Sequence, residues 1–169
     1  CWLLSFPVAQ GSVVEQNPIA GRASVAVRSD VGWIGPGQLF NIIVAITPQS
    51  DWHVYWKNPG VSGAPTEIEV DAPTGFTVGR TIFPRPSIIP TDEGPTFGYN
   101  EQAAIFIPVT APNVINGESV TFEITTSWLA CKKVCVLGEA VTKITLATNP
   151  QTHGARHRDL SLVRWQKLL

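Results

Sequence analysis

Charge, sulfur and long apolar runs are all scarce in this sequence. Its 169 residues include 12 basic and 13 acidic side chains, three cysteines and no methionine. A formal net charge of −1 gives no electrostatic basis for binding nucleic acid or an anionic membrane surface. No apolar run approaches the roughly 20 residues that a membrane-spanning helix requires. We therefore expect no nucleic-acid partner, and membrane contact only through other domains of a longer protein.

The two ends of the chain differ from its middle. Residues 1–11, CWLLSFPVAQG, resemble the end of a secretory signal peptide, in which small residues follow an apolar stretch. We expect a signal-peptide remnant or N-terminal extension there, whose cleavage would remove Cys1; an apolar first strand and a lipid-modified Cys1 are the alternatives. Residues 150–169 are basic and predict a linker or a C-terminal helical segment. Residues 12–149 form the predicted domain, and the missing initiator methionine favours a piece of a longer reading frame.

Short apolar segments separated by glycine and proline dominate the middle of the chain. RASVAVRSD alternates apolar and polar residues, as a half-buried strand does, and the continuous apolar run Leu39 to Ile46 predicts a central strand. About eight such strands with turns at regular intervals predict an all-β fold, an immunoglobulin-like antiparallel β-sandwich.

The segment DWHVYWKNPG alternates aromatic or apolar residues with polar ones. We expect Trp52, Val54 and Trp56 to face the core, because period-two aromatics usually do so in sandwiches. His53 lies on the opposite, polar face of this predicted strand and is expected to face solvent.

A second segment, FPRPSIIPTDEGPTFGYN, holds four prolines and is predicted to be a long loop, because proline does not fit inside a sheet. A loop of this length is either disordered or functional. Its aromatic residues Phe97 and Tyr99 argue against disorder.

Cys131 and Cys135 lie in SWLACKKVCVLGEA, with three residues between them. Four residues of extended strand span roughly 13 Å, whereas disulfide formation needs Cα atoms about 4.4 to 6.8 Å apart. The chain must therefore reverse, and the strand patterns on both sides favour a hairpin with the cysteines opposite each other. A disulfide across so short a loop stabilises little, which favours a redox-active pair.

Lys132 and Lys133 support this interpretation, since positive charge beside a thiol favours the reactive thiolate. A structural disulfide between ordinary turn residues remains open. A tetrahedral zinc site is not visible, because two thiolates need further ligands and His53 is expected to face solvent. His153 and His157 have the i, i+4 spacing of a helical metal site, but we interpret them as a chance pair in a basic tail. We expect no metal and no cofactor, although copper(I) accepts two sulfur ligands and copper(I) handling remains an alternative.

Three segments in this order, DWHVYWKNPGVSGAPTEIE, FPRPSIIPTDEGPTFGY and SWLACKKVCV, resemble the periplasmic N-terminal domain of the thiol:disulfide interchange protein DsbD family, nearest to its ScsB-like branch. The resemblance covers roughly Ala23 to Ala147. It implies a periplasmic immunoglobulin-like domain that takes electrons from a thioredoxin-like domain, itself reduced through a membrane-embedded module. The domain would then reduce disulfides in exported partner proteins, which makes it a protein-disulfide reductase.

The resemblance also implies roles for single residues. Cys131 and Cys135 would be the catalytic pair, with Cys135 attacking the partner and Cys131 resolving the intermediate. A cap loop shields the pair in this family, which here points to Phe97, supported by Tyr99. Asp92 and Glu93 precede that aromatic pair, as acidic residues do in the family, and together with the two lysines would tune the thiolate. Gly94-Pro95-Thr96 intervenes in this chain and puts the distance of the acids from the sulfurs in doubt.

Overall fold

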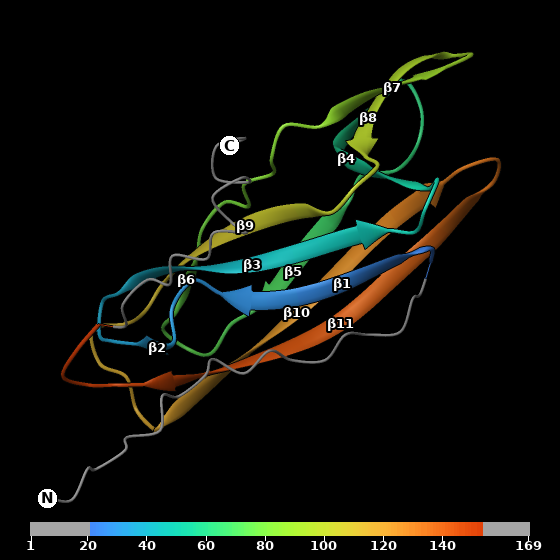
Figure 1. Cartoon of the computed structure of the whole chain (residues 1–169). Coiled ribbons are helices and arrows are strands. Elements are labelled where there is room, and N and C mark those ends of the chain that lie inside the picture. The colour runs from blue at the N-terminus through green and yellow to red at the C-terminus, as the bar shows by residue number, and fades with distance from the viewer. Residues whose placement is uncertain (1–20, 154–169) are drawn as a thin grey trace, which may run out of the picture.

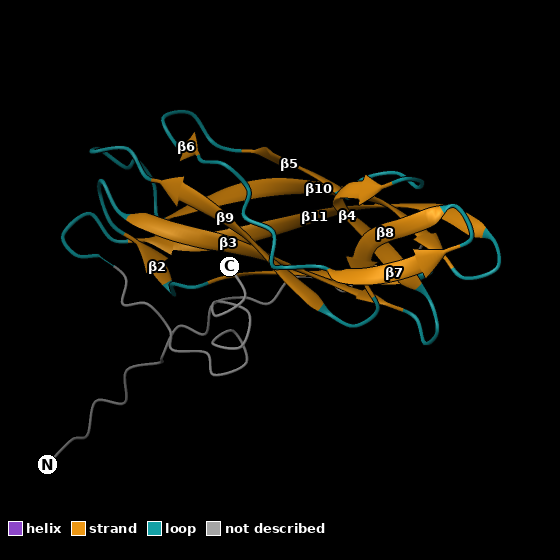
Figure 2. Ribbon diagram, turned by 90° about the horizontal axis from the view of Figure 1, so that it is seen from above, coloured by secondary structure: helices purple, strands orange, loops and turns teal. Residues whose placement is uncertain are grey.

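Two β-sheets packed face to face make up the part of the chain that the computed structural model describes, residues 21–153 (Figures 1 and 2). Within that range there are eleven strands and no helix, so no helix there is long and apolar enough to cross a membrane. The all-β, immunoglobulin-like sandwich predicted from the sequence is confirmed. The expected signal segment with Cys1 and most of the expected C-terminal segment, including His157, lie outside the described residues.

The smaller sheet has four strands in the order β1-β3-β9-β6. Its strands are β1 (Ala23–Ser29), β3 (Leu39–Pro48), β9 (Ala103–Thr110) and β6 (Thr77–Val78). β3 lies between β1 and β9 and is buried at most of its positions, which confirms the central strand that its apolar run predicted.

The larger sheet has seven strands, six of them in the order β2-β11-β10-β4-β8-β7, with β5 paired to β10. They are β2 (Trp33–Ile34), β4 (His53–Gly60), β5 (Glu67–Asp71), β7 (Ser87–Thr91), β8 (Gly94–Tyr99), β10 (Ser119–Cys131) and β11 (Cys135–Thr148). All pairings in it are antiparallel except the short β2–β11 pairing.

Alternation along β10 separates the core face of the larger sheet from its outer face. The even-numbered residues from Phe122 to Ala130 are buried, whereas the odd-numbered residues between them are only partly so. Phe122 contacts the edges of Phe40 and Phe76 at ring-centroid distances of 6.0 and 5.1 Å. Fully buried side chains from both sheets complete this core: Ile34, Phe40, Ile42, Ile46, Ile105, Ile107, Ile124 and Ile144.

β10 and β11 form a hairpin, 13 and 14 residues long, that is paired along its whole length. The alternation in ESVTFEITTSWLAC predicted β10 at its full length, whereas β11 was expected only over its second part, AVTKITLAT. The hairpin crosses the sandwich and ends beyond the smaller sheet (Figure 1). Its tip, residues 132–134, is exposed, whereas Cys131 at the end of β10 is still paired with β4.

The proline-rich segment is not the loop that the sequence predicted. It forms the β7–β8 hairpin, with Pro90 opposite Pro95 in the register. β7 pairs only with β8, at the edge of the larger sheet. An edge strand needs hydrogen bonds on one side alone, so it tolerates residues without an N–H group.

Candidate functional site

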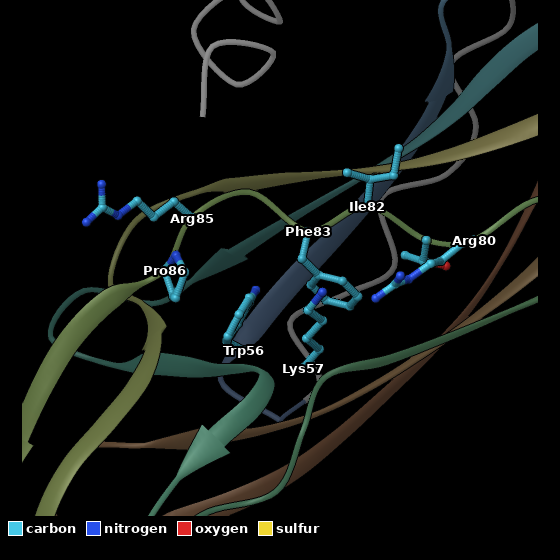
Figure 3. A pocket seen from close by; sticks show the side chains of 8 residues that line it. Trp56, Lys57, Arg80, Ile82, Phe83, Arg85 and Pro86 are labelled. Carbon is cyan, nitrogen blue, oxygen red and sulfur yellow. The ribbon is translucent and has the colours of Figure 1, made fainter. Parts of the chain in front are cut away.

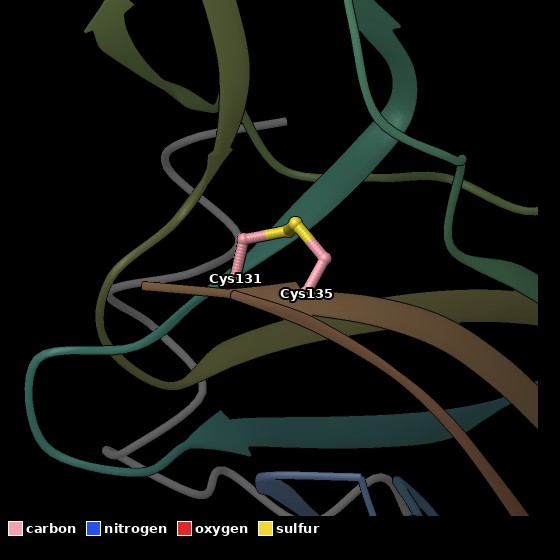
Figure 4. The surroundings of a disulfide bond; sticks show 2 residues. All are labelled: Cys131 and Cys135. Carbon is pink, nitrogen blue, oxygen red and sulfur yellow. A yellow bond between two sulfur atoms is a disulfide. The ribbon is translucent and has the colours of Figure 1, made fainter. Parts of the chain in front are cut away.

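The closed end of the β10–β11 hairpin carries a disulfide between Cys131 and Cys135 (Figure 4). The two residues are the last register pair of the hairpin, and their Cα atoms are 4.1 Å apart. The three intervening residues form the tip, where the Lys132 N–H donates a hydrogen bond to the Val134 carbonyl at 3.1 Å. The predicted hairpin with opposed cysteines is therefore confirmed.

The two sulfur-bearing residues differ in accessibility. Cys131 is only 4% exposed, whereas Cys135 is exposed. Both lie on the outer face of the larger sheet, because Cys131 has the odd-numbered parity of β10 and directly opposed residues share a face. An incoming partner can reach Cys135, while Cys131 is covered.

Lys132 and Lys133, the residues predicted to tune the thiolate, carry the positive charge at the tip of the hairpin. Lys132 Nζ lies 3.0 Å from Asp51 Oδ2, and the two side chains are 42% and 71% exposed. Exposed ion pairs of this kind contribute little to stability. The carboxylate of Asp51 nevertheless offsets the positive charge that Lys132 was expected to place beside the thiols. Lys133 is exposed. The thiolate-tuning role of both lysines stays a prediction.

His53 and Tyr55 are the neighbours of the disulfide on the outer face. His53 is the register partner of Cys131 on β4, and its ring meets the edge of the Tyr55 ring at 5.1 Å. The expectation that His53 faces solvent is wrong: it is partly buried, and its Nε2 atom is fully so. The burial depends on long-range packing that the strand pattern does not show: the segment after β4 folds back over the Tyr55 ring, which lies beside His53. A side-chain Cβ at Gly63 would lie 2.5 Å from the Tyr55 ring.

The predicted cap residues lie elsewhere. Phe97 packs against Trp56, with ring centroids 6.5 Å apart, and Tyr99 is the register partner of the core residue Val54. The Tyr99 hydroxyl donates a hydrogen bond to the Pro84 carbonyl at 2.8 Å, and burial raises its pKa far above the ordinary value. Alternation puts both aromatic residues on the face opposite the disulfide. The shielding role of Phe97 stays a prediction that this arrangement does not display.

Asp92 and Glu93 form the exposed turn between β7 and β8. The pKa of Tyr55 is raised, first by burial of its hydroxyl and second by the negative charge of Glu93. Glu93 thus acts on the aromatic residue next to His53, two side chains away from Cys131. Its direct effect on a thiolate, like that of Asp92, stays a prediction.

A groove of about 550 Å³ lies beside β4 (Figure 3). Its walls carry the cations Lys57, Arg80 and Arg85 and the rings of Trp56 and Phe83. Lys57 Nζ lies 5.1 Å from the centre of the Trp56 ring. Neither cysteine lines it, so it is separate from the cysteine site.

No metal site accompanies the pair. Among residues 21–153, no three or more histidine, cysteine or acidic side chains come together in a way that could hold a metal ion. His153 belongs to a distant contact, where its Nε2 lies 2.8 Å from the Pro36 carbonyl oxygen.

An immunoglobulin-like sandwich with a solvent-accessible disulfide at a hairpin end has the parts that a thiol–disulfide exchange domain needs. The comparisons with known proteins agree. The family model for the N-terminal domain of the thiol:disulfide interchange protein DsbD matches residues 23–147, and the chain belongs to this family. The resemblance inferred from the sequence motifs is therefore confirmed.

One solved structure shows the shared fold. The N-terminal periplasmic domain of ScsB from Proteus mirabilis has a TM-score of 0.64 at 16% identity, over 92% of this chain and 57% of that chain. The N-terminal domain of Neisseria meningitidis DsbD in the reduced form has a TM-score of 0.42 at 15% identity, over 76% and 90%. The chain thus spans a little more than half of the ScsB chain. No curated protein sequence matches it.

We expect both redox states of the domain to be folded. The disulfide closes a loop of only three intervening residues, so its entropic contribution is about 2 kcal/mol at most. Urea unfolding with and without reductant should show a loss of this size or smaller. A Cys131→Ser/Cys135→Ser double variant, as the control, should not respond to reductant. Unfolding of the wild-type domain on reduction alone would contradict this expectation and favour a structural disulfide.

Proposed function

We propose that this chain is a periplasmic thiol–disulfide exchange domain that passes electrons from a thioredoxin-like domain to disulfides in exported proteins. The family supports exchange chemistry in general. The observation that carries the proposal is the asymmetry of the pair, in which an exposed Cys135 stands before a buried Cys131. A domain that relays electrons needs one sulfur that partner proteins can reach and a second sulfur that resolves the mixed disulfide and releases the partner.

The exchange proceeds in two balanced steps. The Cys135 thiolate attacks one sulfur of the partner disulfide, forms a mixed disulfide and releases the other partner sulfur as a thiolate. Cys131 then loses its proton and attacks the Cys135 sulfur. This restores the Cys131–Cys135 disulfide and releases the second partner sulfur as a thiolate, so two electrons have moved from the domain to the partner. A thioredoxin-like dithiol reduces the domain again by the same steps in reverse.

An apolar strip beside the disulfide is the proposed docking surface for the thioredoxin-like partner. Leu129 and Leu137 form the next register pair on the same face as the cysteines. Leu137 is 76% exposed and Val134, at the tip, is 64% exposed. Exposed apolar groups that adjoin one another often mark protein interfaces. A partner that covers this strip would bring its own sulfur to Cys135 and exclude water from the exchange.

Single cysteine variants test the exchange. Reduced Cys131→Ala should form a lasting mixed disulfide through Cys135 with a thioredoxin whose resolving cysteine is replaced by serine and whose remaining cysteine carries a nitrothiobenzoate leaving group, because neither protein then has a second thiol to break the bond. Non-reducing gels and peptide mass mapping would show it, and the Cys135→Ala variant serves as the matched control. Trapping through Cys131 alone would reverse the assigned roles. If neither variant trapped the partner, the proposed exchange function would be wrong.

A second experiment tests the docking surface. Leu137→Glu should slow reduction by thioredoxin at least about fivefold, since losing an interface anchor typically costs more than 1 kcal/mol. Reduction by dithiothreitol, which needs no docking, should keep its rate. Val114→Glu is the matched control: Val114 is 71% exposed and lies between β9 and β10, at the other end of the hairpin. Equal slowing with both reductants would show that Leu137 acts on the cysteines and not on docking.

A further inference from the structure

His53 lies directly opposite Cys131 in the β4–β10 pairing. Cys135, Cys131 and His53 therefore form a row across three adjacent strands, all on the outer face of the sheet. Side chains of directly opposed residues are close enough to interact. Figure 4 shows β4 passing beside the disulfide at this end of the sheet.

The imidazole has an unused nitrogen. His53 Nε2 is fully buried and has no hydrogen-bond partner among the described residues. Buried polar atoms are usually paired, so an unpaired nitrogen beside a disulfide is unusual. A disulfide carries no proton to donate, whereas a reduced cysteine carries one. Reduction of Cys131 would supply the partner that the nitrogen lacks.

The surroundings keep this imidazole neutral. Burial lowers the pKa of His53 below its ordinary value of 6.5. The titratable groups near it are Cys131 from β10 and Tyr55 from its own strand, with Glu93 acting on Tyr55 from the β7–β8 turn. At the tip, the Lys132 charge is paired with Asp51. At neutral pH the imidazole is therefore able to accept a proton.

The step that needs a proton acceptor is the attack by Cys131. Removal from water disfavours a charged thiolate, and Cys131 is 4% exposed. Cys135 is in solvent, where water and buffer can take its proton. The buried cysteine has no such access. A base placed opposite it would speed the second step of exchange without affecting the first.

We propose that His53 is the general base of this second step; the inference rests on the proposed function. His53 takes the proton of the Cys131 thiol as its sulfur attacks Cys135 in the mixed disulfide. The Cys131–Cys135 bond forms, the bond to the partner sulfur breaks, and the electron pair leaves on that sulfur. The imidazolium then returns its proton to the departing thiolate or to solvent.

Reaction of the reduced domain with dithiobis(nitrobenzoate) separates the two steps. Attack by Cys135 releases one coloured nitrothiobenzoate, and attack by Cys131 on the resulting mixed disulfide releases the second. General-base assistance is typically worth about 10²–10⁴-fold. We expect His53→Gln and His53→Phe to slow the second phase at least about tenfold at neutral pH and to leave the first phase unchanged. Added imidazole should restore part of the rate in His53→Ala.

The pH profile gives a readout that a purely structural role would not change. In the wild-type domain the second-phase rate should fall as pH drops through a value below 6.5, where His53 becomes protonated. In His53→Gln that inflection should vanish, and the rate should rise with pH as the thiol ionises. His153→Gln, which alters the distant histidine, is the matched control.

The outcomes separate this inference from the proposed function. Two phases in the wild type with an unaltered second phase in both His53→Gln and His53→Phe would overturn the role of His53 and leave exchange intact. Failure of the wild-type domain to release a second equivalent would overturn the proposed exchange itself. If both substitutions disturbed folding, the wild-type pH profile alone would decide, since absence of the low-pH inflection contradicts the assignment.

Discussion

The register of the β10–β11 hairpin is the constraint on which the site depends. Thirteen consecutive pairs, from Ser119 with Ala147 to Cys131 with Cys135, fix which residues stand opposite each other. Because side chains alternate between faces, a slip of one residue on one strand would put the sulfurs on opposite faces. The buried even-numbered residues of β10 prevent this slip, since it would expose the core. The core of the fold therefore fixes the position of the disulfide.

The same register accounts for the different exposure of the two cysteines. Cys131 ends a strand that is paired to β4 on its other side, and it is covered; Cys135 begins a strand whose tip stands in solvent. Cys135 is exposed, which suits the proposed attack on a partner disulfide. Cys131 lies opposite an imidazole, which suits a second attack that needs a proton acceptor. The apolar strip around Leu137 would hold a partner long enough for both. The same local geometry thus connects the core, the proposed docking surface and the proposed proton acceptor.

Local patterns were sufficient for the fold class and for the cysteine pair. Alternating segments such as RASVAVRSD carry the sheet signal in their own residues, and the distance between Cys131 and Cys135 allows few solutions. Long-range packing decided the rest. His53 has a polar position in its strand, yet it is partly buried beside Tyr55, whose ring the segment around Gly63 covers. Pro90 was compatible with a strand because β7 lies at an edge, which depends on the order of strands in the sheet. The cap residues, assigned by resemblance, lie on the opposite face from the sulfurs in this arrangement.

The reduction potential of the Cys131–Cys135 pair tests the central claim most directly. Equilibration in glutathione buffers, followed by alkylation and mass spectrometry, would measure it. A pair that receives electrons from a thioredoxin-like dithiol and passes them on should titrate reversibly between about −270 and −180 mV. A value below about −300 mV, typical of structural disulfides, or a pair that does not equilibrate at all, would contradict the account.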